Sequence, residues 1–106
     1  MNIYTEDEAL LELLEYGKTN DKRYKKLPKE AVKGFLKAVK YLTLATRIED
    51  LYRFKGLNYE ALQGTYKGFE SVRCNDTWRL IFKSYSQEGS FIVTEVSLIK
   101  ISHHYE

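Results

Sequence analysis

The chain has 106 residues, of which 43% are hydrophobic and 30% are charged, and its formal net charge is +2. This length predicts a single domain, residues 1–106, with a modest core. No apolar run approaches the ~18 residues of a membrane span. The acidic start lacks the basic and apolar segments of a signal peptide, and the one cysteine has no partner for an internal disulfide. We therefore expect a cytoplasmic protein without a membrane partner.

The small net charge conceals an asymmetry along the chain. Residues 1–16 carry −5, residues 17–83 carry +9 from 16 basic and 7 acidic side chains, and residues 84–106 carry −2. A basic middle section suits a polyanion such as RNA. The lysines up to Lys40 are equally compatible with solvated helix faces, so the charge pattern leaves both interpretations open.

The N-terminal section predicts a short strand and a first helix. Residues 2–4 are a weak candidate for the strand. Thr5 followed by Glu8 fits a capping box, so the helix is expected to begin after Thr5. Apolar residues then recur at helical spacing. Gly17 is the expected end of this helix.

A second helix is predicted after a polar and basic connector at residues 18–27. Pro28 suits its first turn, an apolar stripe follows at helical spacing, and the helix is expected to end near Ala45. Thr46 with Glu49 is a further possible capping box, for a short helical turn. Two successive helices with a short link indicate a helical hairpin.

The hydrophobic period changes to two after residue 68, while residues 56–68 are interpreted as a loop with at most one helical turn. Asn75 and Asp76 mark a turn between two strands. A loop of residues 75–77 keeps the apolar side chains on one face, whereas a shorter loop mixes the faces. The favoured register gives these pairs: Cys74 with Trp78, Val72 with Leu80, and Arg73 with Arg79.

The last strand is predicted over residues 91–99, after a turn at residues 87–90. The expected fold class is therefore α+β, with two N-terminal helices packed on one face of a small antiparallel β-sheet. The other face is expected to be partly open. Trp78 and Cys74 alternate with core residues, so we expect both to be core, with Cys74 a small apolar filler rather than a nucleophile.

The polar side of these strands carries a basic set. Arg73 and Arg79 face each other, Lys83 follows on the same side, and Lys67 lies just before the first strand. Like charges in such a pair are destabilising, whereas arginine offers a fork of donors that matches phosphate. The set therefore indicates phosphate binding and stabilisation of a phosphorane-like transition state. The alternative is a solvated sheet face, balanced by Glu95.

Titratable groups also occur near the C-terminus and in the central loop. His103 and His104 are the two histidines of the chain, and Tyr105 follows them. Histidine suits acid–base chemistry near neutral pH. A metal site and a frayed tail without function are the alternatives. Glu60 is a candidate functional carboxylate in the loop.

The segment LNYEALQGTYKGFESVRCNDTWRLIF, residues 57–82, resembles the central block of HigB-type toxins in the RelE/ParE superfamily. There a leucine, a K-G-D-like segment and a glycine lead into strands that read S-I-R-V-N-D and W-R-L-I-F. The segment EYGKTNDKRYKKLP at residues 15–28 and the ending ISHHY at residues 101–105 also resemble a subgroup of these toxins. The likeness covers nearly the whole chain.

The resemblance implies a type II toxin that is encoded beside a helix-turn-helix (HigA-like) antitoxin. Such a toxin enters the A site of the 70S ribosome and cleaves messenger RNA. The 2′-hydroxyl of the RNA attacks the adjacent phosphate, with no metal and no cofactor.

The resemblance also assigns residue roles. The implied catalytic residues are Arg73, Arg79, His104 and Glu60, and the implied substrate-binding residues are Lys55, Lys67, Lys83, His103 and Tyr105. Two positions depart from the family pattern. Gln63 stands where the K-G-D segment has lysine, so Lys67 or Lys55 is the candidate replacement. Glu60 stands where some members have histidine, and it is a candidate base.

Two other functions remain open from the sequence. The first is a ParE-like toxin of the same fold, which inhibits DNA gyrase by binding alone; the terminal histidines argue against it. The second is an inactive RNA- or protein-binding module, which Gln63 and Glu60 keep open.

Overall fold

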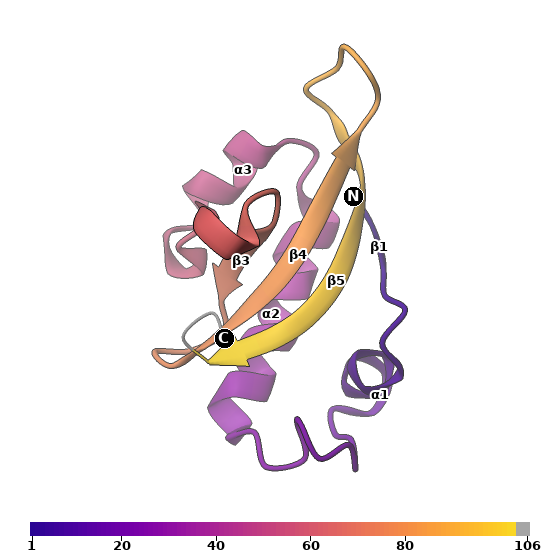
Figure 1. Ribbon diagram of the computed structural model, residues 1–106, viewed down its shortest axis with the longest axis vertical. Coiled ribbons are helices and arrows are strands. Elements are labelled where there is room, and N and C mark those ends of the chain that lie inside the picture. Colours follow the sequence, from indigo (N-terminus) through magenta and orange to yellow (C-terminus); the bar gives the residue numbers. More distant parts are fainter. Residues whose placement is uncertain (104–106) are drawn as a thin grey trace.

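The computed structural model describes residues 1–103, which form a five-stranded sheet in the order β1-β5-β4-β3-β2 with helices packed against it (Figure 1). The strands are β1 (Asn2–Tyr4), β2 (Glu60–Ala61), β3 (Glu70–Arg73), β4 (Trp78–Ser86) and β5 (Val93–His103). The helices are α1 (Glu8–Tyr16), α2 (Lys29–Leu44), α3 (Ile48–Arg53) and the short 3-10 helices η1 (Lys55–Leu57) and η2 (Gly64–Tyr66). The α+β prediction is confirmed.

The sheet is mixed, not wholly antiparallel as expected. β1 runs parallel to β5, while the other neighbouring strands are antiparallel. A parallel pair needs a long crossover connection, and here the whole chain between β1 and β5, helices included, supplies it. The central segment also differs from the expected loop, because it contains β2, η1 and η2.

The main core lies between the sheet and α2, which crosses behind β4 and β5 in the view of Figure 1. Phe35 and Leu42 of α2 are completely buried, as are Leu80 and Phe82 of β4. The apolar stripe of α2 therefore meets the apolar side of the strands, as the two periodicities predict. Among the described residues, no helix is long and apolar enough to span a membrane.

The start of α1 differs from the prediction. Its N-cap is Asp7, whose Oδ1 accepts a hydrogen bond of 2.9 Å from the backbone N–H of Ala9. Thr5 instead donates its hydroxyl to the carbonyl oxygen of Leu98 at 2.8 Å, which ties the chain to β5. The Thr5 hydroxyl also accepts a hydrogen bond of 3.1 Å from the backbone N–H of Asp7, so Thr5 holds the chain just before the cap. The predicted end at Gly17 is confirmed, with φ 73° and a left-handed conformation.

The other helix ends agree only in part with the sequence. α2 begins at Lys29, so Pro28 is its N-cap and not a residue of its first turn as predicted, whereas the predicted end near Ala45 is confirmed. The prediction of a Thr46–Glu49 capping box was wrong, because α3 begins one residue later than that pattern requires. Asp50 Oδ2 accepts hydrogen bonds from the backbone N–H groups of Thr46 (3.0 Å) and Arg47 (3.2 Å).

The predicted register of β3 and β4 is confirmed. Val72 lies opposite Leu80, Arg73 lies opposite Arg79, and the N–H of Cys74 donates to the carbonyl of Trp78 at 2.9 Å. The turn at residues 87–90 is also confirmed by a hydrogen bond from Ser90 N–H to the Gln87 carbonyl. The last strand, however, begins later and runs further than the predicted 91–99, because it pairs with β4 along almost its whole length.

Gly34 sets the distance between α2 and the β3–β4 turn. A Cβ atom at this position would lie 1.6 Å from the carbonyl oxygen of Cys74, which is a backbone atom. Glycine therefore lets the helix pass directly over the turn. This close approach fixes where α2 stands relative to the end of β3.

The connector between α1 and α2 is tied to both the helix start and β5. The Arg23 guanidinium donates to both carboxylate oxygens of Asp7, at 2.7 and 2.9 Å, and to Asp21. The Tyr24 hydroxyl accepts a hydrogen bond of 3.2 Å from the backbone N–H of Ile101. The basic connector is thus an ordered part of the fold.

Candidate functional site

The sheet face opposite α2 gathers the basic strand residues. Alternation along the paired strands places one set of side chains on this face, which we call the arginine face: Glu60, Ser71, Arg73, Arg79, Ile81, Lys83, Lys100 and Ser102. The face is less open than expected. Ile81 and Leu62 are buried but lie outside the main core cluster, so part of this face is a second, smaller packing surface.

Arg79 is held in place by its neighbours on this face. Its Nε donates to the Ser71 hydroxyl at 3.0 Å, and its terminal NH2 group donates to the backbone carbonyl of Asn58. Asn58 follows η1 in a left-handed conformation with φ 43°, which directs that carbonyl toward the arginine. The half-buried guanidinium is therefore positioned before any ligand arrives, as preorganised electrostatic stabilisation requires.

Arg73 stands directly opposite Arg79, and its side chain is 37% exposed. Its guanidinium pairs with Asp76 in the β3–β4 turn. The side chain of Asp76 is 91% exposed, and such surface pairs contribute little to stability. An anion of higher charge can therefore compete with Asp76 for Arg73.

Further cations on this face lie over aromatic rings. Lys83 Nζ is 5.6 Å from the centroid of the Phe69 ring and 5.9 Å from that of Tyr85. Lys100 Nζ donates to the Tyr66 hydroxyl at 2.8 Å. Lys67, in the same loop as Tyr66, is exposed. Cations interleaved with aromatic rings form a surface that suits single-stranded nucleic acid.

Glu60 also lies on the arginine face. Glu60 is exposed and pairs from β2 with Ser71 of β3. Ser71 is two residues before Arg73 on β3, so both side chains point to the same face. The structure therefore brings the candidate base and both candidate phosphate-binding arginines to the same face of the sheet.

His103 lies on the other face. It pairs with Trp78, and the two rings are 5.0 Å apart at 58°. Trp78 is half-buried at the margin of the main core, so the expectation that it faces the core holds, although it is not fully enclosed. His103 is exposed but is not brought beside the arginines. His104 and Tyr105 lie outside the described residues.

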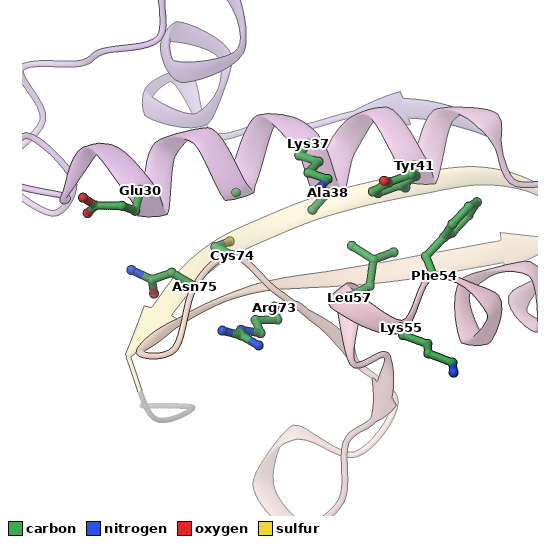
Figure 2. A pocket seen from close by; sticks show the side chains of 12 residues that line it. Glu30, Lys37, Ala38, Tyr41, Phe54, Lys55, Leu57, Arg73, Cys74 and Asn75 are labelled. Carbon is green, nitrogen blue, oxygen red and sulfur yellow. The ribbon is translucent and has the colours of Figure 1, made fainter.

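Lys55 belongs to a pocket at the end of β3 (Figure 2). The pocket has a volume of about 440 Å³ and lies between α2, η1 and the β3–β4 turn. Lys55 lines it together with Arg73 and with Lys37 of α2. Lys37 was not singled out from the sequence, where it resembles any lysine on a solvated helix face.

Cys74 is buried, and burial raises the pKa of its thiol to about 12. A thiol with so high a pKa is a poor nucleophile at neutral pH. The structure thus confirms its role as a small apolar filler.

Among residues 1–103, no group of three or more His, Cys, Asp or Glu side chains could hold a metal ion.

Sequence reasoning missed the residues that position the arginines and flank them. Ser71 and Asn58 are polar residues with no distinctive spacing, and Lys100 lies beyond the predicted end of the last strand. The alternation of Ser71 with Val72 was the one available signal, since it places Ser71 on the side of Arg73.

Comparison with solved structures identifies related folds. A YoeB/ParE toxin from Agrobacterium tumefaciens superposes with a TM-score of 0.57 at 12% identity, over 99% of this chain and 100% of that chain. The H87Q mutant of YafQ from E. coli gives a TM-score of 0.50 at 16% identity, over 97% and 92%. At these identities the likeness concerns the fold, which is that of the RelE-like toxins.

The family follows from the sequence comparisons. The family model described as the RelE-like toxin of the type II toxin–antitoxin system HigB matches residues 6–96. Toxin HigB-1 of Vibrio cholerae serotype O1 is 33% identical over 70 residues, which is 66% of this chain and 74% of that toxin. The chain therefore belongs to the HigB-like toxin family of type II toxin–antitoxin systems, and an antitoxin is its partner.

Proposed function

We propose that this toxin is a ribosome-dependent endoribonuclease that cleaves messenger RNA in the A site of the 70S ribosome and so inhibits translation. The observation that carries the proposal is the opposed pair of Arg73 and Arg79 on the arginine face. Two like charges directly across a sheet repel each other, and a phosphate between them turns that repulsion into binding. The family membership supports the same conclusion.

In the proposed chemical step, the RNA supplies the nucleophile and side chains of the toxin move the protons. The 2′-hydroxyl oxygen attacks the adjacent phosphorus, and the bond from phosphorus to the leaving 5′-oxygen breaks. Glu60 takes the proton of the 2′-hydroxyl, and His104 gives a proton to the 5′-oxygen. The products are a 2′,3′-cyclic phosphate and a 5′-hydroxyl end.

The arginines stabilise the charge that develops during this step. The pentacoordinate transition state carries more negative charge on its oxygens than the starting diester, and Arg73 and Arg79 offer fixed donors for it. Removing one donor of this kind typically costs about 10²–10³-fold in rate. Other side chains are proposed to bind the flanking RNA: Lys55, Lys67, Lys83 and Tyr105. His103, expected from the sequence to join them, lies on the other face of the sheet and is left out of this set.

The proposed partners and location follow from the same family. The antitoxin is a HigA-like helix-turn-helix protein that also represses the operon, and the toxin acts in the cytoplasm, where it meets ribosomes. The basic section at residues 17–83, with a charge of +9, suits contact with ribosomal RNA as well as with the message.

Expression in bacteria from a tight promoter, with mapping of messenger RNA 5′ ends, tests this function. The unaltered toxin should arrest growth and create new 5′-hydroxyl ends within translated codons. Arg79→Ala should abolish both, whereas Arg53→Ala, an exposed arginine on α3, should leave both intact. Arrest without new ends would instead support gyrase inhibition, and no arrest would support an inactive binding module.

A further inference from the structure

The pocket at the end of β3 combines positive charge with an apolar floor (Figure 2). Its cations are Lys37, Lys55 and Arg73, and Glu30 is its one acidic lining residue. Its volume of about 440 Å³ falls within the usual range of small-ligand sites, about 300–1,000 Å³. A net positive pocket of this size suits an anionic ligand.

One end of the pocket is aromatic, and Lys37 and Lys55 lie at this same end. The rings of Tyr41 and Phe54 stack with their centroids 4.3 Å apart, and Lys37 Nζ lies 5.8 Å from the Tyr41 centroid. Ala38 and Leu57, both buried, add apolar surface. An aromatic and apolar wall accepts the face of a nucleobase, while the cations accept a phosphate. The two features together match a nucleotide rather than a simple anion.

The position of the pocket links it to the arginine face. Arg73 lines the pocket from β3 and is also the register partner of Arg79. Lys37 belongs to α2 and Lys55 to η1, on opposite walls of the pocket, and the Lys55 side chain extends away from α2 (Figure 2). The pocket lies on the α2 side of the sheet, and Arg73 is the residue that it shares with the arginine pair.

We propose that this pocket receives one nucleotide of the RNA, the direct neighbour of the phosphate bound by Arg73 and Arg79. Its base lies on the Tyr41 and Phe54 side, and its phosphate meets Lys37 and Lys55. This inference rests on the proposed function for the identity of the ligand as RNA. It adds Lys37 to the residues that bind substrate and gives Lys55 a defined partner.

Nuclear magnetic resonance of the purified, ¹⁵N-labelled chain tests the pocket without any cleavage step. Three probes are added separately: an adenosine trinucleotide RNA, adenosine 5′-monophosphate and inorganic phosphate. The RNA and the monophosphate should both shift the amide signals of Gly34 and Gly56, which line the pocket. The trinucleotide should bind more tightly than the monophosphate, because it also reaches the arginine pair.

Charge reversal supplies the matched variants. The double variant Lys37→Glu with Lys55→Glu should weaken trinucleotide binding by about tenfold or more, since two attractive charges become repulsive. Lys40→Glu changes an exposed lysine on the same helix that does not line the pocket, and binding should persist. No shift at Gly34 or Gly56, equal binding of phosphate alone, or an equal loss in Lys40→Glu would overturn the proposal.

The two proposals fail in different ways. If the unaltered toxin makes no breaks in messenger RNA while the trinucleotide still binds the pocket, the nuclease function fails and the nucleotide site stands. If breaks occur as expected but the pocket signals do not respond to any probe, the nucleotide site fails and the nuclease function stands.

Discussion

Arg73 and Arg79 are directly opposed on β3 and β4, and each guanidinium is already held by a group of the protein: Arg79 by Ser71 and the Asn58 carbonyl, Arg73 by Asp76. The two differ in how firmly they are held. Arg79 donates to groups within the folded sheet and the η1 end, whereas the partner of Arg73 lies in an exposed turn. We therefore expect Arg79 to be a fixed donor and Arg73 to be the one that moves onto the ligand.

Substitution of Arg79 tests its proposed role as a fixed donor to the phosphate. Arg79→Ala should lower cleavage by about 10²–10³-fold, and Arg79→Lys should restore only part of it, since lysine lacks the planar fork. Cleavage of a reporter message by purified toxin on ribosomes measures both. Ser71→Ala should give a smaller loss, through a less well oriented guanidinium. Full activity in Arg79→Ala would contradict the assignment.

Glu60 is predicted to act as the base. Glu60→Gln keeps the size of the side chain but removes its ability to take a proton, so the cleavage rate should fall by about 10²–10⁴-fold. Glu95→Gln, an exposed glutamate on β5, is the control and should cleave normally. Single-turnover cleavage of a reporter message on ribosomes measures both variants, and an unchanged rate in Glu60→Gln would transfer the role of base to another group.

The contact between Gly34 and Cys74 predicts a large effect of a small change. Alanine in a helix interior ordinarily stabilises by about 1 kcal/mol relative to glycine, but here its Cβ would collide with the Cys74 carbonyl. We expect Gly34→Ala to lower the free energy of unfolding by about 1–3 kcal/mol. Gly56→Ala, where a Cβ has no atom within 4 Å, should change it little. Urea denaturation compares the two, and equal stabilities would refute the close approach.

The Asp7–Arg23 pair predicts how stability depends on pH. Burial raises the pKa of the Asp7 carboxyl, but hydrogen bonds from Arg23 and Ala9 lower it by more, so the folded pKa lies below its ordinary value. The contribution of the Asp7–Arg23 pair to the free energy of unfolding is therefore fully present above the pKa of Asp7 in the unfolded chain, about 3.9. It is lost as the pH falls through the lower folded value.

Asp7→Asn isolates this contribution, because asparagine still caps the helix. The variant should be about 1 kcal/mol less stable than the unaltered protein at pH 7, and the difference should shrink at pH 3. Urea denaturation at both values measures it. Glu6→Gln, which alters a neighbouring exposed carboxylate, should match the unaltered protein at pH 7. A gap for Asp7→Asn that persists at pH 3 would contradict the ion-pair account.

The register of the arginine pair could be predicted from the sequence because parity leaves little choice. Of a two-residue and a three-residue loop, only the three-residue loop keeps Val72 and Leu80 on the same side of the sheet. That loop also places Arg73 opposite Arg79. The ends of α2 could be predicted to within about one residue. Pro28 marks its start, and the last residues of the apolar stripe mark its end.

The helix caps show where local patterns are insufficient. Thr5 and Asp7 both precede α1 and both can cap a helix, and the outcome depends on a bond from Thr5 to Leu98, far along the chain. The choice between Glu49 and Asp50 depends on a one-residue difference in where α3 begins. Tertiary contacts decide which of two adjacent side chains caps a helix, and a short stretch of sequence does not contain these contacts.

The pocket and the face of His103 also required the three-dimensional structure. Lys37, Lys55 and Arg73 come from three separate elements, so no spacing in the sequence joins them. His103 lies beyond the predicted end of the last strand, and its pairing with Trp78 places it away from the arginine face.

The most direct test of the central claim uses purified toxin, purified 70S ribosomes and a message with a defined codon in the A site. We predict cleavage within that codon only when ribosomes are present, with 5′-hydroxyl and 2′,3′-cyclic phosphate ends, and loss of cleavage in Arg79→Ala and His104→Ala. An intact message in the presence of the unaltered toxin and ribosomes, or equal cleavage by the Arg79→Ala variant, would contradict it.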